Sequence, residues 1–218
     1  MDRLTRTASG LTKEEYKTLM NLSTPIKIQD FLDALPMNFE KEGDTHRSPR
    51  AVLRTQKAHC IEGAMLAATA LWLHSEPPLI MNLSARLGRG DVDHVITLYK
   101  RNGYYGAISK TNHAVLRFRD PIYRTLRELA LSYFNEWFLI SSGEKTLECY
   151  SKQLDLEKHF GTAWITQEKD LWEVAEALSV TPHYQLVPKG NLRYLRKADA
   201  MEMKAGSFPE WTENNPRT

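Results

Sequence analysis

Two residues of this chain could carry out covalent chemistry together. Cys60 opens the one long apolar run, residues 61–73, and His94 follows about 34 residues later on a strand-like segment. A thiolate at the start of a helix is stabilised by the partial positive charge and the free amides found there, and an imidazole can serve it as a base. The pair indicates acyl chemistry through a thioester, with Cys60 as the nucleophile and His94 as the general base and later the acid.

Acyl transfer also needs hydrogen-bond donors for the oxyanion that develops on the attacked carbonyl. At a helix start, the first backbone N–H groups have no partner within the helix. The amide of Cys60 is therefore one candidate donor, and the side-chain amide of Gln56 is a second. Both groups are expected on the oxyanion side of the site.

The groups that could orient the His94 ring follow from a predicted hairpin. Asn102-Gly103 is a strong signal for a two-residue turn, and the register that it sets places His94 opposite Thr111. Ser109 is then a diagonal neighbour on the same face, and Asn112 lies nearby. We take Ser109 as the first candidate for the third catalytic residue, with Thr111 or Asn112 as the alternatives.

Two carboxylates close to His94 in the sequence are expected to point away from it. Asp91 and Asp93 lie at odd offsets from His94, and side chains at odd offsets along a strand are on opposite faces. The sequence therefore offers hydroxyl groups at a place where a carboxylate would stabilise an imidazolium more strongly.

The segments around these residues predict an α+β fold in which a buried helix, started by the cysteine, packs on an antiparallel sheet. Residues 60–74 are apolar on nearly every helical face, which is typical of a central helix, and Pro77-Pro78 ends it. Three strand-like segments follow and would form the sheet: residues 79–87, 92–100 and 104–111.

Further elements are predicted on both sides of this core. Thr12 and Glu15 have the spacing of a capping box at a helix start. Asp120-Pro121 indicates the start of an amphipathic helix that runs to residue 138, with Asp120 as its N-cap. The other predictions are a helix over residues 28–35, a loop over 40–50, a strand over 162–165, a helix over 168–178 and a strand over 184–187.

Composition fits one main domain with appendages. The 218 residues carry a formal net charge of only +2, so there is no overall attraction to nucleic acid or to an anionic membrane, and neither partner is expected. Two cysteines are too few for a disulfide framework and fit a reducing compartment. The charged first residues and the short apolar stretch at 64–73 give neither a signal peptide nor a membrane span, so we expect a cytoplasmic protein.

No cofactor or metal is expected. The histidines near the cysteines lack the spacing of metal ligands: His46, His59, His74 and His113. A basic and aromatic stretch around Tyr194 could contact RNA, but a solvated surface is the interpretation that we favour.

The order of these features resembles the transglutaminase-like cysteine hydrolase superfamily. The resemblance covers roughly residues 48–138 and rests on Cys60 at the start of a buried helix, His94 in the segment Asp93-His94-Val95-Ile96, and Gly103-Tyr104-Tyr105-Gly106 opening the next strand. It implies a papain-like core, a cysteine nucleophile with a histidine base, and a peptide or protein amide as the substrate. It also implies hydrolysis or acyl transfer, as in peptidases, isopeptidases and amidases.

The chain departs from the superfamily pattern at two positions. The aspartate of the family corresponds here to Ser109, and His59 stands where many members have a small residue. A catalytically inactive module that binds a peptide or a protein in the same cleft is therefore the alternative hypothesis. The expected organisation is a helical leader and loop over residues 1–47, the core over 48–140, an α/β extension over 141–205 and a disordered tail over 206–218.

Overall fold

The computed structural model describes residues 3–212. Helices gather mainly in the first third of the chain: α1 (Arg6–Ser9), α2 (Lys13–Asn21), α3 (Pro25–Ala34), α4 (Pro49–Thr55) and α5 (Cys60–Leu73). Strands follow, with one helix among them: β1 (Leu79–Ala85), β2 (His94–Arg101), β3 (Tyr104–Ile108), β4 (Arg119–Tyr123), α6 (Leu126–Phe134), β5 (Leu147–Ser151) and β6 (Leu154–Asp155). The last elements are α7 (Leu156–Phe160), η1 (Ala163–Ile165), α8 (Trp172–Val180), β7 (His183–Gln185), η2 (Lys189–Tyr194) and α9 (Ala200–Gly206).

Side-chain caps define the starts of the early helices. The predicted capping box is confirmed, because Thr12 and Glu15 exchange hydrogen bonds with each other's backbone amides at the start of α2. The Ser48 side chain caps α4 by accepting from the Ala51 amide, with Pro49 at the first helical position. The last residues of the predicted loop over 40–50 therefore belong to a helix, because Ser48-Pro49 starts α4 and does not break the chain into a loop.

One antiparallel sheet forms the centre of the molecule, in the strand order β4-β3-β2-β1-β5-β7 with β6 pairing β1. The predicted hairpin is confirmed: Arg101 pairs with Tyr104 on either side of Asn102-Gly103. The ladder continues only to Thr97 opposite Ile108, so the chain beyond Ile108 leaves the sheet before it reaches the position opposite His94.

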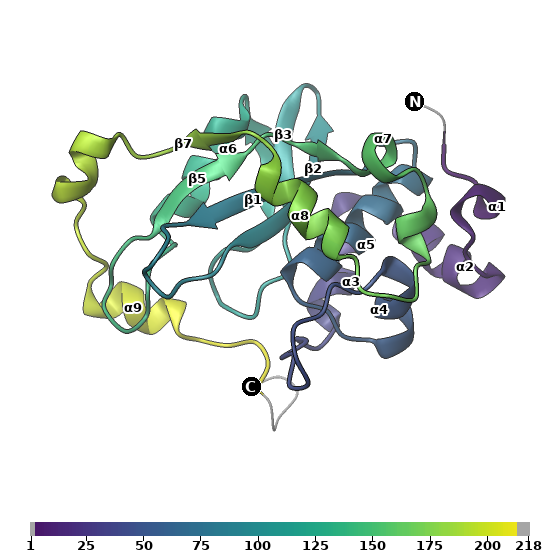
Figure 1. The fold of residues 1–218 in the computed structure, drawn as a ribbon, viewed down its shortest axis with the longest axis horizontal. Coiled ribbons are helices and arrows are strands. Elements are labelled where there is room, and N and C mark those ends of the chain that lie inside the picture. Colours follow the sequence, from purple (N-terminus) through teal and green to yellow (C-terminus); the bar gives the residue numbers. More distant parts are fainter. Residues whose placement is uncertain (1–2, 213–218) are drawn as a thin grey trace.

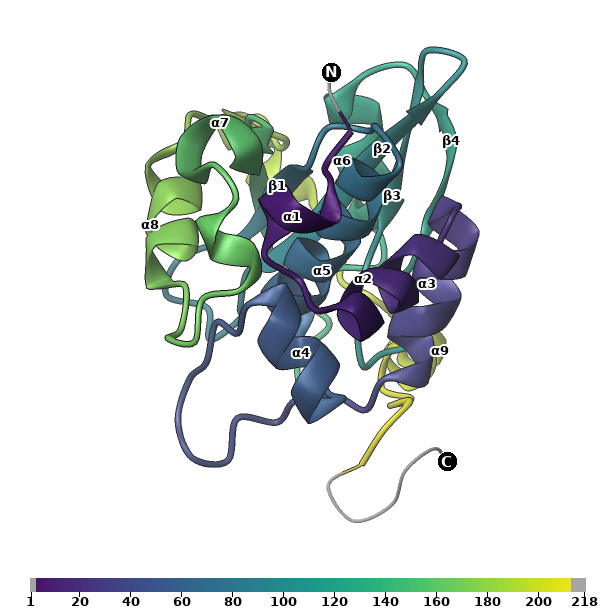
Figure 2. The same cartoon turned by 90° about the vertical axis from the view of Figure 1, so that its right-hand side faces the viewer.

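The predicted α+β class is confirmed, and the helix that begins at Cys60 packs on the sheet. One sheet face carries Ile80, Val95 and Tyr99 into a core shared with α5 and the N-terminal helices. The other face carries Ile96 and Leu98 into a second core with α6. Figure 2 shows α5 between the sheet and the layer of α2, α3 and α4.

Two sequence predictions of secondary structure are wrong. Asp120-Pro121 does not start a helix: residues 119–123 form the edge strand β4, and the helix begins only after Thr125, which caps α6. An edge strand tolerates proline because one row of its N–H groups faces away from the ladder. The segment predicted as a strand at residues 162–165 is the 3₁₀ helix η1.

The tail predicted to be disordered from residue 206 is ordered where the structure describes it. Trp211 is buried, and its backbone N–H and C=O bond to the side-chain amide of Asn112. This buried pairing, together with the backbone hydrogen bond from Glu210 to the Asn112 carbonyl, holds the segment against the core. The remainder of the predicted tail, residues 213–218, lies outside the described residues.

The described helices include none that is both long and apolar enough to cross a bilayer. Figure 1 shows the helices of the first third clustered beside one end of the sheet, while α9 lies at the opposite end.

Gly63 allows α5 to approach the chain that leaves β3. A Cβ atom at this position would lie 2.6 Å from the Cβ of Lys110, whose buried ammonium group donates to the carbonyls of Leu32 and Leu35. We expect Gly63→Ala to lower the free energy of unfolding by about 1–3 kcal/mol, because the contact is overpacked. Urea unfolding measures the change, and Gly190→Ala, where a Cβ meets nothing within 4 Å, should change it by less than about 0.5 kcal/mol. Equal effects of the two variants would contradict this interpretation.

Candidate active site

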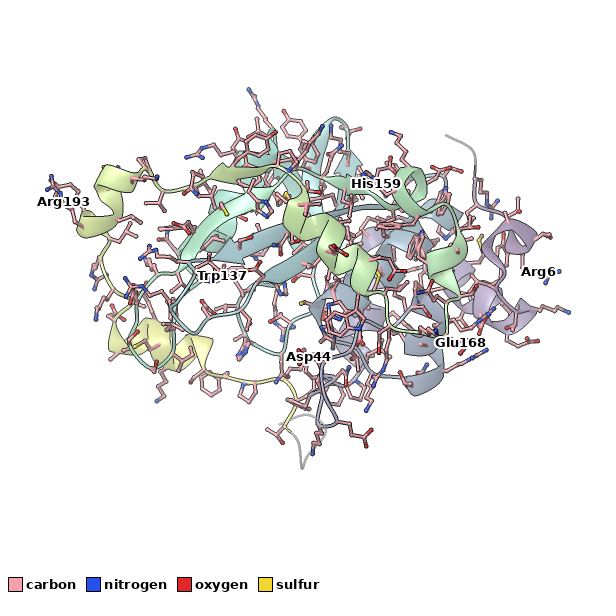
Figure 3. The ribbon with its side chains drawn as sticks, viewed as in Figure 1. Arg6, Asp44, Trp137, His159, Glu168 and Arg193 are labelled. Atoms are coloured by element: carbon pink, nitrogen blue, oxygen red, sulfur yellow. The ribbon has the colours of Figure 1, made fainter. Side chains whose placement is uncertain are left out.

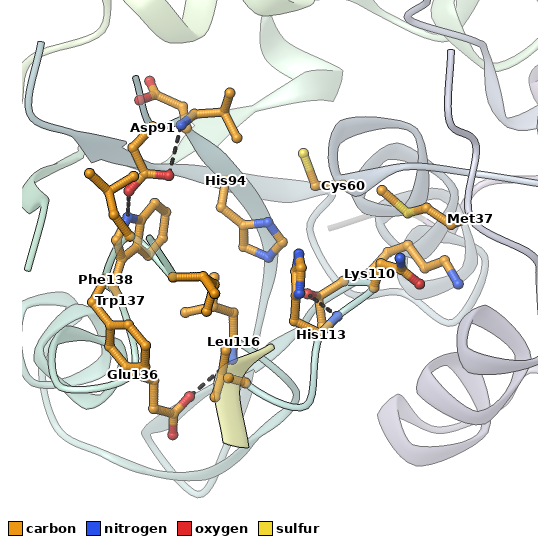
Figure 4. Close-up of a pocket in the computed structure, with 18 residues that line it drawn as sticks. Met37, Cys60, Asp91, His94, Lys110, His113, Leu116, Glu136, Trp137 and Phe138 are labelled. Atoms are coloured by element: carbon orange, nitrogen blue, oxygen red, sulfur yellow. Dashed lines mark hydrogen bonds between the residues drawn. The ribbon is translucent and has the colours of Figure 1, made fainter. Parts of the chain in front are cut away.

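Cys60 lies at the first position of α5, partly exposed, in the wall between two cavities. The larger cavity has a volume of about 330 Å³ and also contains His94; the smaller, about 210 Å³, also contains His59. Figure 4 shows the larger one, with the His94 ring between Cys60 on one side and Trp137 on the other. The thiol therefore adjoins a histidine-lined cavity on each side, with His94 and His113 in the larger cavity and His59 and His46 in the smaller one.

A chain of hydrogen bonds fixes the protonation pattern of His94. The Ser109 hydroxyl donates to the Leu116 carbonyl at 2.5 Å, so its oxygen is free to accept. The Nε2 atom of His94 lies 2.7 Å from that oxygen and must be the donor. In the neutral ring, the lone pair is therefore on Nδ1, the nitrogen left to interact with the Cys60 thiol.

Ser109 is itself held rigidly. Its backbone N–H donates to the Gln29 side-chain oxygen at 2.9 Å, and its carbonyl accepts from the Gln29 amide at 2.8 Å. Gln29 is buried on α3, so a helix far away in the sequence positions the hydroxyl that orients His94. The structure brings together Cys60, His94 and Ser109, the three residues placed first from the sequence.

The two alternatives to Ser109 make their hydrogen bonds elsewhere. The Thr111 hydroxyl accepts from the backbone of His113, two residues on. The Asn112 side chain is committed at both ends to Trp211. Thr111 therefore shapes the loop after β3, and Asn112 holds the C-terminal segment. Both residues lie beyond Ile108, where the chain has already left the sheet.

The expectation for Gln56 needs correction. Gln56 is exposed at the C-cap of α4 in the left-handed region, and its side-chain amide donates to the Leu53 carbonyl at 2.5 Å. That bond commits the donor to its own helix. The backbone amide of Cys60, at the first position of α5, remains a candidate for the oxyanion because helical geometry gives it no intrahelical acceptor.

The carboxylates of the two aspartates near His94 in the sequence also accept hydrogen bonds from other groups. Asp93 accepts from the Asn82 side chain and the Ala85 amide, away from His94 as expected. Asp91 precedes β2, so strand alternation does not apply to it, and it lines the larger cavity while accepting from Trp137 and Thr146.

His59 is the site residue that the sequence reasoning missed. Its Nδ1 atom lies 4.0 Å from the Cys60 sulfur, and its Nε2 atom lies 2.7 Å from the Thr45 carbonyl. Carboxylate oxygens of Glu40 and Glu62 are 3.4 Å and 3.5 Å from the same Nε2. The only sequence signal was the bulk of His59 at a position where the superfamily often has a small residue.

Glu62 ties the start of α5 to the loop that precedes it. The side chain is fully buried and accepts from Asn38, the Thr45 hydroxyl, the Arg47 amide and the amide of His59. These donors satisfy a carboxylate that would otherwise be costly to bury. The result is a buried carboxylate within the first turn of α5, two residues after the thiol.

The two imidazoles set the electrostatics of the thiol. Burial alone would raise the pKa of Cys60, but hydrogen bonds with His59 and His94 and the charges of both rings outweigh burial and lower this pKa to about 5. Burial likewise opposes the charged form of His59, while its bond to Cys60 and the charges of Cys60 and Glu62 raise the pKa of His59 to about 9. Around neutral pH, the two residues form a thiolate–imidazolium pair.

Alkylation should separate the two free thiols of the chain. The pKa of Cys60 is lowered to about 5, so its thiolate is present above that pH, whereas burial raises the pKa of Cys149 and keeps it protonated. We expect iodoacetamide to label Cys60 more than about tenfold faster than Cys149 at pH 7, after allowing for the weaker nucleophilicity of a low-pKa thiol. Peptide mass spectrometry measures both rates; equal rates would mean that Cys60 is an ordinary thiol.

Comparison with known proteins gave no match to any family model and none to a curated protein sequence. The described residues also contain no cluster of three or more His, Cys, Asp and Glu side chains that could hold a metal ion. The chemistry that the arrangement can perform therefore has to be inferred from the site itself. Its parts are an activated thiol at a helix start, an oriented imidazole and an adjoining cavity.

Proposed function

We propose that this chain is a transglutaminase-like cysteine enzyme with a papain-like core, which forms a thioester between Cys60 and the acyl group of a peptide or protein amide. The observation that supports it most is the hydrogen-bond chain from Leu116 through Ser109 to His94, which presents Nδ1 to the thiol. An inert, buried cysteine would have no need of an oriented imidazole.

In the acylation step, the Cys60 thiolate attacks the amide carbon while His94 carries a proton on Nδ1 as well as on Nε2. A C–S bond forms, and the negative charge moves to the carbonyl oxygen, where the Cys60 amide can donate to it. The imidazolium then gives its proton to the leaving nitrogen as the C–N bond breaks. An amine leaves, and the acyl group remains on Cys60 as a thioester.

In the second step, water or an amine attacks the thioester carbon and His94 takes the proton of the attacking group. Collapse of the tetrahedral intermediate breaks the C–S bond and releases the acid or the new amide. The sulfur leaves as a thiolate beside the protonated His94, which restores the starting pair. Water and amine acceptors thus use the same residues, and the acceptor that reaches the thioester decides between hydrolysis and transfer.

The larger cavity favours an apolar acyl group. Its walls include apolar side chains on several sides: Met37, Val115, Leu116, Trp137, Phe138 and Ile140. The carboxylates on its rim are occupied, since Asp91 accepts from Trp137 and Glu136 accepts from Arg119 at 2.6 Å. We therefore propose an apolar or aromatic residue on the acyl side of the amide. Both cysteines are free thiols, which fits the cytoplasmic location expected from the sequence.

Turnover of fluorogenic peptide amides tests the proposal. The full chain is incubated with amides that differ in the acyl-side residue, with and without hydroxylamine as an amine acceptor, and amine release and hydroxamate are measured. We expect release from apolar substrates, an acyl adduct on Cys60 by mass spectrometry, and complete loss in Cys60→Ala. Cys149→Ala is the matched control and should retain activity. Undiminished release by Cys60→Ala would refute the proposal.

The alternative is an inactive module that binds a peptide in the same cavity. The neutral Ser109 hydroxyl favours it, because a hydroxyl stabilises an imidazolium less than a carboxylate does. Tight binding of an apolar peptide amide, with no adduct on Cys60 and equal affinity in Cys60→Ala, would support this second function.

A further inference from the structure

We infer that His59 is a second imidazole of the active site: it is the fixed positive partner of the Cys60 thiolate, while His94 is the imidazole that moves protons. This deepens the proposed function and rests on it for the meaning of the thiolate. The Cys60 sulfur lies between His94 in the larger cavity and His59 in the smaller one.

The surroundings of His59 hold a proton on both of its ring nitrogens. Nε2 lies 2.7 Å from the Thr45 carbonyl, which can only accept, so Nε2 carries a hydrogen. The carboxylates of Glu40 and Glu62 lie within 3.5 Å of the same atom and favour a positively charged ring. The second N–H, on Nδ1, then faces the sulfur at 4.0 Å.

The hydrogen-bond partner of the His94 ring is a neutral group, unlike the carboxylates beside His59. Its Nε2 donates to the neutral Ser109 hydroxyl, which adds no charge that would hold a proton on the ring. The negative charge that the aspartate of a transglutaminase-like triad would place behind the proton-transferring histidine lies here behind His59. One imidazole is therefore built to keep its proton throughout the cycle, and the other to release and regain one.

The other charged groups around His59 are consistent with this division. Within α5, the ring faces Cys60 and Glu62. From the preceding loop it faces Glu40 and, at a ring-centroid distance of 6.0 Å, His46. Burial and the charge of His59 lower the pKa of His46, so His46 remains neutral and does not compete for the carboxylates. Two further charges lie one contact away: Arg47, 3.9 Å from Glu62, and Asp170, which accepts from the His46 amide.

The pH dependence of Cys60 alkylation tests the inference. The full chain and its His59→Asn variant are labelled with iodoacetamide from about pH 4 to about pH 9, and the Cys60 peptide is quantified. Asparagine is chosen because it is favoured at a helix N-cap, the position of His59. In His59→Asn, we expect the midpoint, the pH at which labelling of Cys60 is half-maximal, to rise by at least one unit. Below that pH, labelling of the variant should be about tenfold slower than labelling of the unaltered chain. His159→Asn, on the exposed surface of α7 (Figure 3), is the matched control and should leave the midpoint unchanged.

An unchanged midpoint in a folded His59→Asn variant would overturn the inference. If that variant does not fold, the histidine NMR signals of the unaltered chain decide the question: one of the seven imidazoles should stay protonated until its pKa of about 9, and titration of all seven below about pH 8 would overturn it. Labelling detects the thiolate without turnover. The inference can therefore fail while acyl transfer stands, and acyl transfer can fail while the labelling shift is observed.

Discussion

Replacing His94 by glutamine is expected to slow turnover of a peptide amide by about 10²- to 10⁴-fold, the usual contribution of a positioned acid and base. Glutamine keeps a polar group beside Ser109 but can neither give a proton to the leaving nitrogen nor take one from the attacking water or amine. Alkylation of Cys60 should be much less affected, because His59 still faces the sulfur at 4.0 Å. The initial rate of amine release measures the first effect, and iodoacetamide labelling at pH 7 measures the second.

Ser109→Ala is the companion variant. It leaves Nε2 of His94 and the Leu116 carbonyl without their partner, and a lost buried hydrogen bond of this kind corresponds to about a tenfold loss of rate. His159→Gln, far from both residues in the sequence and exposed, should have full activity. A His94→Gln enzyme with more than a tenth of the original rate would show that another group transfers the proton.

Glu62→Gln is expected to lower the free energy of unfolding by about 3–5 kcal/mol, the cost of removing one partner from a buried charged network. Both carboxylate oxygens accept hydrogen bonds: one from Thr45 and Arg47, the other from the amide of His59. In the glutamine variant, one of these two oxygens is replaced by an NH₂ group. That group is a donor, and it will face a donor of the surrounding network at either position. Urea unfolding at pH 7 measures the difference.

The control for Glu62 is Glu14→Gln, in the exposed first turn of α2. It makes the same chemical change at the surface and should alter stability by less than about 0.5 kcal/mol. A Glu62→Gln variant as stable as this control would mean that the network around the start of α5 reorganises around an amide, and that its charge is not needed for folding.

The parts of the fold that follow from local sequence were predictable. Residues 60–73 are apolar on nearly every face, so the buried helix and its start at Cys60 could be placed from the residue pattern alone. Asn102-Gly103 fixed the hairpin register as far as Thr97 opposite Ile108, and Ser109, the next residue along the chain, bonds to His94. These signals succeed because each depends on neighbours a few residues apart.

The parts that depend on distant segments were not predictable in the same way. Asp120-Pro121 has the composition of a helix start, yet pairing with β3 makes it an edge strand. His59 is recognisable as a site residue only once the loop with Glu40 and Thr45 folds back onto it. The Gln56 prediction failed for a local reason, because Gln56 ends α4 in the left-handed conformation and its side-chain amide donates to the Leu53 carbonyl. In the first two cases the folded conformation of the chain outweighed the local pattern.

The two hydrogen bonds between Asn112 and Trp211 affect the order in which the site is assembled. Gly206 contributes to the wall of the larger cavity, and the segment that follows it is pinned to the loop after β3. Cys60, His94 and Ser109 are all synthesised long before this segment. A chain still emerging from the ribosome thus has its thiol and both imidazoles before the part of the cavity wall at Gly206 is in place.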